Sequence, residues 1–217
     1  MNLLITPRGT NAYLHSLSKR IVDLLFALIF LVLLTPLIVL VSIILIISIG
    51  RPVIFTQLRM GKNNRPFLIY KFRTMKKNAS KLQSELISQN EADGPVFKIK
   101  NDPRFIGPGK FLAQTGLDEI PQLLNVIKGD MSLVGPRPLP LKEANKLTQQ
   151  QKSRHQIRPG LTSQWVLSGS HNISFQNWMK LDQNYLKHAS FRKDLEILIT
   201  TCTMVISMCY HMLFGKN

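Results

Sequence analysis

The chain has 217 residues, and its 28 Lys and Arg side chains against 12 Asp and Glu give a formal net charge of +16. Hydrophobic residues make up 45% of it, which excludes a disordered basic tail, and the charge excludes an ordinary neutral cytosolic domain. Two Cys exclude a disulfide framework.

The first predicted element is an apolar segment, residues 24–49, which holds 26 residues without a charge. A bilayer-crossing helix needs about 20 such residues. The segment is too long for the apolar core of a signal peptide, which has roughly 7–15 residues. Its length and apolarity also argue against a buried helix of a soluble protein. The sequence therefore predicts a membrane helix.

The two ends of this membrane helix carry the same charge, and its middle holds a proline. Basic side chains flank it on both sides: Lys19, Arg20, Arg51 and Arg59. The positive-inside rule draws both ends toward the cytoplasm, and Thr35-Pro36 predicts a sharp kink near the middle. We therefore expect a re-entrant, Pro-broken helix, with a straight span as the open alternative because spanning helices tolerate proline. Asp23 is expected to pair with Lys19 or Arg20 at the interface.

The rest of the chain predicts a small hairpin followed by helices and loops. Residues 52–58 and 66–73 are β-like and flank the turn sequence GKNN. Helical spacing or capping indicates helices at 78–92, about 115–128, 141–155, 175–187 and 192–214. The last is expected to lie in the membrane interface or pack on the domain rather than span. The predicted fold class is α+β, mainly helical, with residues 1–50 as an N-terminal segment and membrane helix and residues 51–217 as one cytosolic domain with interfacial amphipathic helices.

The chain holds one adjacent pair of acids, Asp118-Glu119, at a predicted helix start. Acids are favoured there by the helix dipole without any function. The surrounding loops favour a site, because arginines next to proline are held in place as phosphate recognition requires. These clusters are Asp102-Pro103-Arg104, Gly135-Pro136-Arg137-Pro138 and Arg158-Pro159-Gly160, with Lys71 and Arg73 further upstream.

Two acids among several arginines suit phosphate chemistry beside a membrane. Nearby positive charge is expected to keep both carboxyl groups ionised. An ionised Asp118 is a competent nucleophile toward phosphorus. Glu119, with Asp118 beside it, is the expected ligand of Mg²⁺, which binds through one or two carboxylates when substrate phosphates supply other ligands.

Residues 117–138, LDEIPQLLNVIKGDMSLVGPRP, resemble the signature block of the bacterial sugar transferases, the monotopic phosphoglycosyl transferases. The segments KFRTM, DPR, RPGLT and Leu181-Asp182 with Tyr185 fall in the order of that family, and the resemblance covers roughly residues 18–210. It implies a protein of the bacterial inner (cytoplasmic) membrane that carries a re-entrant helix broken at Thr35-Pro36. The catalytic domain would lie on the cytoplasmic face, and the chain would be a minimal form without an extra N-terminal domain.

The resemblance also implies an activity. Family members transfer a sugar-1-phosphate from a UDP-sugar to a polyprenyl phosphate, such as undecaprenyl phosphate, release UMP and need Mg²⁺. The product, a polyprenyl-diphosphate-linked sugar, begins a surface glycan: O-antigen, capsule, exopolysaccharide or glycoprotein. The family's Asp-Glu dyad matches Asp118 and Glu119, and we expect a covalent aspartyl-phosphosugar intermediate on Asp118. The expected partners are the donor, the lipid acceptor and membrane lipids, without nucleic acid; a homodimer is left open.

The remaining residues receive roles by their place in these motifs. Arg104, Arg137 and Arg158 are expected to contact phosphates, and Lys71 and Arg73 either do so or bind anionic lipid. Pro136 and Pro138 stiffen their loop, while Asp182 and Tyr185 either take part in the site or are structural, a hydrogen-bonded pair that braces it. The competing interpretation, a membrane-tethered module that binds anionic lipid or nucleic acid without catalysis, explains the charge but not the ordered arginine loops.

The chain departs from the usual pattern of the family at four positions: Ala113, Gln114, Gly116 and Ser163. The family commonly has basic residues and a Ser before LDE and a Gly after RPGLT. These departures affect the fine geometry and the choice of sugar, which the sequence does not identify.

Overall fold

The computed structural model describes residues 11–169 and 173–214, so residues 1–10 of the predicted N-terminal segment lie outside it. The described part is mainly helical with one small antiparallel hairpin, which confirms the α+β expectation. The α-helices are α1 (Leu17–Ile49), α2 (Ala79–Glu85), α3 (Gly109–Thr115), α4 (Leu123–Lys128), α5 (Leu141–Ala144), α6 (Gln164–Leu167), α7 (Phe175–His188) and α8 (Phe191–Phe214). The strands are β1 (Ile54–Met60), β2 (Pro66–Phe72), β3 (Ser132–Val134) and β4 (Gly160–Thr162). Short 3₁₀ helices are η1 (Ala12–His15), η2 (Lys62–Asn64), η3 (Ile87–Gln89), η4 (Leu117–Gln122) and η5 (Gln151–Gln156).

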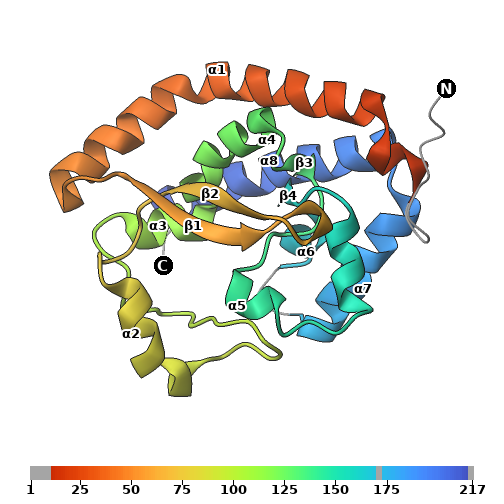
Figure 1. Cartoon of the computed structure of the whole chain (residues 1–217). Helices are drawn as coiled ribbons and strands as arrows, with labels where there is room; N and C mark the ends of the chain where they lie inside the picture. The colour runs from red at the N-terminus through yellow and green to blue at the C-terminus, as the bar shows by residue number, and fades with distance from the viewer. Residues whose placement is uncertain (1–10, 170–172, 215–217) are drawn as a thin grey trace.

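Helix α1 forms an arch over one side of the molecule, above α4 and α8 (Figure 1). It runs unbroken through Pro36, so the expected sharp break there is wrong. Proline removes one backbone donor, and the hydroxyl of Thr35 bonds back to the Leu31 carbonyl at 2.7 Å, a contact that often bends a helix. Helix α1 is therefore curved along its length rather than sharply kinked at Pro36.

Both ends of α1 are fastened to the rest of the protein. At the N-terminal end the Lys19 ammonium lies 2.8 Å from Asp23 and 2.7 Å from Asp194 of α8. The predicted Asp23–Lys19 pair is confirmed, but it is buried within the protein. At the C-terminal end Arg73 donates to the carbonyls of Ile49 and Gly50 at 2.6 and 2.7 Å.

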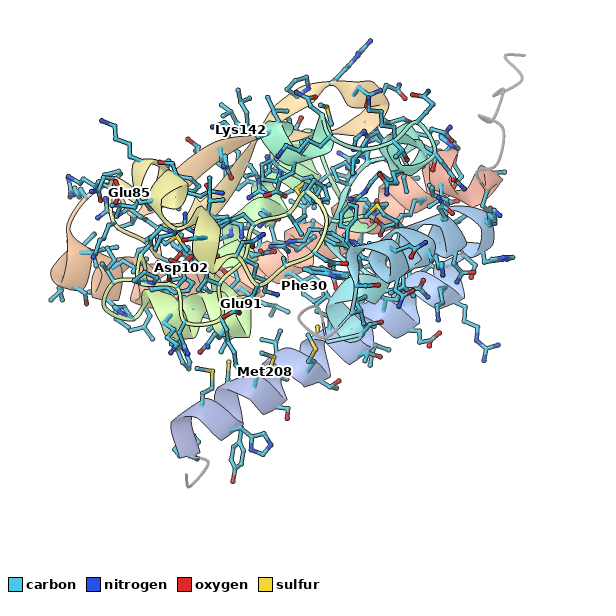
Figure 2. All side chains as sticks on the ribbon, turned by 90° about the horizontal axis from the view of Figure 1, so that it is seen from below. Phe30, Glu85, Glu91, Asp102, Lys142 and Met208 are labelled. Atoms are coloured by element: carbon cyan, nitrogen blue, oxygen red, sulfur yellow. The ribbon has the colours of Figure 1, made fainter. Side chains whose placement is uncertain are left out.

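Between these anchors α1 exposes apolar side chains. Its exposed hydrophobic residues include Leu25, Leu28, Val32, Leu33, Leu40 and Ile47. By length and composition both α1 and residues Phe191–Met212 of α8 suffice to cross a membrane. The second half of α8, marked by Met208, extends along one edge of the molecule (Figure 2).

The predicted hairpin is confirmed. Strands β1 and β2 pair antiparallel, with Ile54 opposite Phe72 and Met60 opposite Pro66. Asn63 and Asn64 in the connecting turn have positive φ angles of 54° and 57°, a conformation that Asn tolerates better than most residues. Side chains of β2 alternate between faces, so Phe72 points into the core while Lys71 points away from it.

Three predicted helices are shorter than expected. The helix at 78–92 is α2 followed by η3. The helix at about 115–128 is η4 followed by α4, and it begins after Gly116, whose φ of 76° ends the preceding helix α3. The helix at 141–155 is divided because Thr148 and Gln151 bond reciprocally, side chain to backbone, at 2.9 and 3.3 Å. Such a capping box begins a new helical turn.

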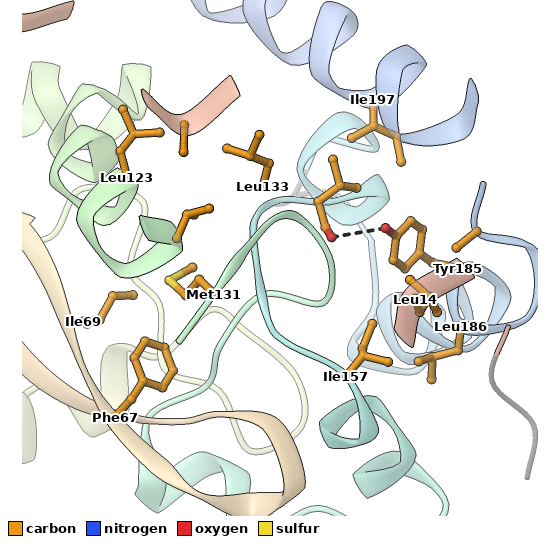
Figure 3. Close-up of a cluster of buried hydrophobic side chains, with 14 of the residues drawn as sticks. Leu14, Phe67, Ile69, Leu123, Met131, Leu133, Ile157, Tyr185, Leu186 and Ile197 are labelled. Carbon is orange, nitrogen blue, oxygen red and sulfur yellow. Dashed lines mark hydrogen bonds between the residues drawn. The ribbon is translucent and has the colours of Figure 1, made fainter. Parts of the chain in front are cut away.

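The main core lies between α1, the hairpin, α4, α7 and α8, and its members are drawn in Figure 3. They include Phe67, Leu123, Met131, Leu133 and Ile197, each no more than 9% exposed. Strand β3 pairs in parallel with β4 at the centre of this core. Gly135 and Gly160 pass so closely that a Cβ on either would overlap the backbone of the other. The loops that follow β3 and precede β4 are thereby held against each other.

Candidate active site

The acid pair lies in η4, on the short bridge between α3 and α4. Gly116 at positive φ turns the chain after α3, and the 3₁₀ turn that follows holds Pro121, whose missing N–H costs little near a helix start. The side chains of Asp118 and Glu119 are only 8% and 14% exposed. Two carboxyl groups are thus held side by side in a place with little water.

Two cations from distant segments meet this pair. The Lys71 ammonium of β2 lies 2.6 Å from Oε1 of Glu119 and 3.4 Å from Oδ2 of Asp118. Arg137, in the loop after β3, donates to both oxygens of Glu119 at 2.6 and 3.1 Å. This two-pronged contact fixes the guanidinium as well as its charge. Both residues were predicted for the site, and the position of Lys71 beside the acids favours the first of its two expected roles, contact with substrate phosphates, over binding of anionic lipid.

The two acids are in different electrostatic states. Burial by itself raises the pKa of Glu119, but the charges of Arg137 and Lys71 outweigh burial and hold that pKa well below its usual range. Burial raises the pKa of Asp118 above its ordinary value, and Lys71 only partly opposes it while the charge of Glu119 adds to it. The expectation that positive charge would lower both pKa values is therefore wrong for Asp118.

Arg137 is held by a second layer of contacts. Arg154 donates to the backbone carbonyl of Arg137 at 2.6 Å and pairs with Asp182 of α7 at 3.0 Å. Arg59 of β1 donates to the Pro138 carbonyl at 3.1 Å, and burial lowers its pKa to about 10. The backbone carbonyls of Arg137 and of the next residue, Pro138, are therefore both bonded to buried cations.

Arg137 and a further cation, Lys98, both lie close to one aromatic ring, that of Trp165. The guanidinium lies 5.5 Å from the ring centre of Trp165, and the Lys98 ammonium lies 5.9 Å from the same ring. Trp165 is itself stacked on Trp178 at 4.2 Å. Burial, and then the charge of Arg137, lower the pKa of Lys98 to about 8. Among the described residues the Lys98 ammonium has no carboxylate within ion-pair distance, so it is available to an anion.

Three predicted phosphate ligands bond elsewhere. Arg104 pairs with Asp102 through contacts of 2.6 to 3.1 Å. Arg158 donates to the Gly129 carbonyl at 2.9 Å, and Arg73 closes the end of α1. Within the described residues, none of the three hydrogen-bonds or pairs with an acid of the site, so the structure does not bring them to it.

Asp182 and Tyr185 do not form the hydrogen-bonded pair that was one of the two expectations. Asp182 pairs with Arg154, and burial raises its pKa to about 6. The Tyr185 hydroxyl bonds to Asp194 at 2.7 Å. It also bonds to the Val134 carbonyl at 3.1 Å (Figure 3). Asp182 thus supports the loop of Arg137, while Tyr185 belongs to the buried network that anchors α1.

The departures from the family pattern have local structural reasons. Gly116 suits its positive φ, which a Ser would adopt only with strain. Ser163 begins α6, where its hydroxyl accepts from the Val166 N–H. Ala113 is partly buried and Gln114 exposed on α3, and nothing in the structure explains why they are not basic.

The loop prolines hold backbone carbonyls in place. Pro136 and Pro138 are both buried, and the carbonyl of Pro136 accepts from the Gly160 N–H at 3.0 Å. The sequence did not point to Lys98, Trp165 or Arg154 as parts of this site, and it indicated Arg59 only as a basic residue that flanks the membrane helix. Their one sequence signal is that Lys98 and Trp165 lie in Pro- and Gly-rich loops.

The two acids can serve a metal ion only together with other ligands. Among the described residues no group of three or more His, Cys, Asp or Glu side chains is arranged to hold a metal. Both oxygens of Glu119 already accept hydrogen bonds, whereas Oδ1 of Asp118 accepts none from described residues. This donor set fits Mg²⁺ that is also bound by phosphate oxygens and water, which is its usual mode.

Known proteins match most of this chain in sequence. The family model described as bacterial sugar transferase matches residues 14–208. Galactosyl transferase CpsE of Streptococcus agalactiae is 40% identical over 198 residues, which is 89% of this chain and 43% of CpsE. The uncharacterized sugar transferase EpsL of Bacillus subtilis is 38% identical, with 87% of both chains covered. An undecaprenyl-phosphate galactose phosphotransferase of Salmonella typhimurium is 36% identical over 72% of this chain and 34% of its own length. The chain therefore spans less than half of two of these relatives and most of the third.

Proposed function

The chain belongs to the bacterial sugar transferase family, and from this premise we propose that it transfers a sugar-1-phosphate from a UDP-sugar to a polyprenyl phosphate. The observation that carries the proposal is the buried Asp118-Glu119 pair, which Lys71 and Arg137 contact from separate segments. One acid is bound by two cations, and the other keeps an oxygen free of described partners. That asymmetry suits a division of roles in which Glu119 holds the two cations in place and Asp118 reacts.

In the first step an oxygen of Asp118 attacks the phosphorus that bears the sugar. The bond from that phosphorus to the bridging oxygen breaks, and UMP leaves with the electron pair. Lys71 and Arg137 are placed to stabilise the negative charge that builds up on the phosphate oxygens. Lys98, held beside the Trp165 ring, supplies a third positive charge for the donor diphosphate.

In the second step an oxygen of the polyprenyl phosphate attacks the same phosphorus. The bond to Asp118 breaks, the carboxylate is restored and the polyprenyl-diphosphate sugar is released. When bound, Mg²⁺ would be held by Asp118 and Glu119 and would neutralise charge on the diphosphate. Buried Asp118 needs the Lys71 charge to be ionised for the first step, because burial alone favours its protonated form.

The anchoring of α1 supports a re-entrant position in the bilayer. A straight helix of 33 residues is about 50 Å long, and both of its ends bond to the same domain, through Lys19 and Arg73. A straight crossing would place these ends on opposite faces of the membrane. The domain would thus rest on one membrane surface, the cytoplasmic face by the positive-inside rule.

The test uses the purified chain, a radiolabelled UDP-sugar and Mg²⁺ without a lipid acceptor. Because the names of two relatives specify galactose, a panel of donors begins with UDP-galactose. We expect UMP in an amount equal to the enzyme and label bound to the protein, and Asp118→Asn should abolish both. Release of UMP only when the polyprenyl phosphate is also present would indicate direct transfer and contradict the covalent step. No UMP with any donor would contradict the function.

A further inference from the structure

A second cationic site lies at the N-terminal end of α1, among residues that do not contact the acid pair. Arg20 and Arg158 converge on the end of α4. Arg20 donates to the carbonyls of Val126 and Ile127 at 2.7 and 3.1 Å, and Arg158 donates through Nε to the carbonyl of Gly129 at 2.9 Å. These bonds leave the terminal nitrogens of Arg158 without a hydrogen-bond partner among the described residues. Donors of a fixed guanidinium are therefore directed to the surface.

The two arginines border a small pocket that is open to solvent. Lys62 of the hairpin turn is not part of the pocket lining, but its charge acts on the same group. Burial and then the charge of Arg158 lower the pKa of both Lys62 and Arg20. Among the described residues the Lys62 ammonium has no hydrogen bond or ion pair. Two guanidinium groups thus line one small pocket, and the charge of Lys62 interacts with that of Arg158.

The acid that lines this pocket does not cancel these charges. Asp23 accepts from the Lys19 ammonium at 2.8 Å and from the Leu133 N–H at 3.1 Å, and its second oxygen accepts from the Ser132 hydroxyl at 2.8 Å. Lys19, which also lines the pocket, is in turn paired with Asp194. The carboxylate is therefore fully engaged, and an anion would meet net positive charge.

The pocket continues into an exposed apolar surface. With 100° of rotation per residue, Arg20 lies between the buried face of α1, marked by Lys19 and Asp23, and a stripe formed by Leu17, Ile21 and Leu28. These three leucine and isoleucine side chains are 50–73% exposed. A ligand with a phosphate at one end and an alkyl chain at the other matches both features at once, because charge and apolar surface adjoin on one side of the helix.

We propose that the pocket lined by Arg20 and Arg158, with the charge of Lys62 acting on it from the hairpin turn, binds the phosphate of an anionic phospholipid, whose acyl chains lie along α1. Free phosphate shares the charged end but would gain nothing from the apolar stripe. The bound lipid would fix the depth of the domain in the bilayer at the N-terminal end of α1. The C-terminal end of α1 is held by Arg73. The proposal does not depend on the chemistry at Asp118.

The experiment measures the melting temperature of the full chain in neutral detergent with short-chain phosphatidylglycerol, phosphatidylcholine or inorganic phosphate. We expect phosphatidylglycerol to bind at least tenfold more tightly than either of the others. Lys62→Gln and Arg158→Gln should each weaken it about fivefold, the effect of one basic side chain at an anionic lipid. Lys81→Gln and Arg192→Gln remove exposed charges elsewhere and should leave it unchanged.

Several results would overturn the proposal. Equal stabilisation by the two lipids, or by inorganic phosphate alone, would show that no lipid site exists. An equal loss in the two control variants would show that binding depends only on overall charge. Arg158→Gln also removes a hydrogen bond to the end of α4, so Lys62→Gln is the decisive variant. If Lys62→Gln binds phosphatidylglycerol as tightly as the wild type does, the proposed lipid site is wrong. If Lys62→Gln raises the KM for polyprenyl phosphate as much as it weakens phosphatidylglycerol, the pocket takes the acceptor instead.

Discussion

Replacing Lys71 with Met should shift the pH dependence of activity. Burial raises the pKa of Asp118, and the Lys71 charge is the largest opposing influence. Without that charge the pKa of Asp118 rises further. The carboxylate is the reactive form, so activity is lost as pH falls through this pKa. The acidic limb of the pH profile should therefore move to higher pH in Lys71→Met.

The size of the effect follows from the contact distance. At 3.4 Å between Nζ and Oδ2, the attraction is about 5 kcal/mol at an effective dielectric constant of about 20. Water and neighbouring groups compensate for much of this on substitution. If only about a quarter of it is lost, near 1.2 kcal/mol, the ionised fraction of Asp118 falls about eightfold wherever this group is mostly protonated. We therefore expect about that loss of rate on the acidic limb and substantial recovery by pH 9.

The assay is UMP release with UDP-sugar and polyprenyl phosphate from pH 5.5 to pH 9, with kcat and KM measured separately. Lys71→Arg keeps the charge and should keep the limb near its original position. Lys128→Met is the matched control, because Lys128 contacts Tyr70 of the same strand at 2.6 Å but neither acid. A profile for Lys71→Met that is lower but parallel to the wild type would refute the reasoning. Lys71 would then only bind substrate phosphate.

Four further predictions concern supporting residues and the metal. Asp182→Ala leaves Arg154 as an unpaired buried charge and should lower the free energy of unfolding in urea by about 3–5 kcal/mol; a loss below about 1 kcal/mol would contradict this. Burial lowers the pKa of His155 from its usual 6.5 to about 4. Its contribution to stability should therefore be full above pH 6.5 and be lost as pH falls toward 4, and His155→Gln should flatten that decline. Lys98→Gln should raise the KM for the UDP-sugar about tenfold, whereas Lys100→Gln, two residues away, should not. EDTA should abolish UMP release without changing the melting temperature, since the described residues hold no complete metal cage; a large drop in melting temperature would show a structural ion.

Local chemistry allowed several features to be predicted from the sequence. The uncharged run of 24–49, the GKNN turn between two β-like segments and the helical pattern of the last two helices each depend on neighbouring residues. The Asp118-Glu119 pair and its signature block also needed no tertiary contact. An equally local contact explains why Arg104 does not reach the acid pair. Asp102 lies two residues away, and its carboxylate binds the Arg104 guanidinium within one turn.

Helix continuity was harder to predict because it depends on small local differences. Pro36 costs α1 one hydrogen bond, and packing at both ends keeps the helix intact and curved. Gly116 has no side chain to restrict φ, and it ends α3 just before the acid pair. The sequence pattern alone did not show that Pro36 would only bend its helix whereas Gly116 would end one.

The sequence by itself determined that this is a basic membrane protein of the sugar transferase type with one acid pair at its centre. Only the tertiary structure decided which of five predicted cations serve that pair. Lys71 and Arg137 meet it because the alternation of β2 and the close crossing at Gly135 and Gly160 direct them there, whereas Arg73 and Arg158 are directed to the ends of helices. Contacts between residues 18 to 48 positions apart depend on the packing of whole elements, and no local spacing encodes them.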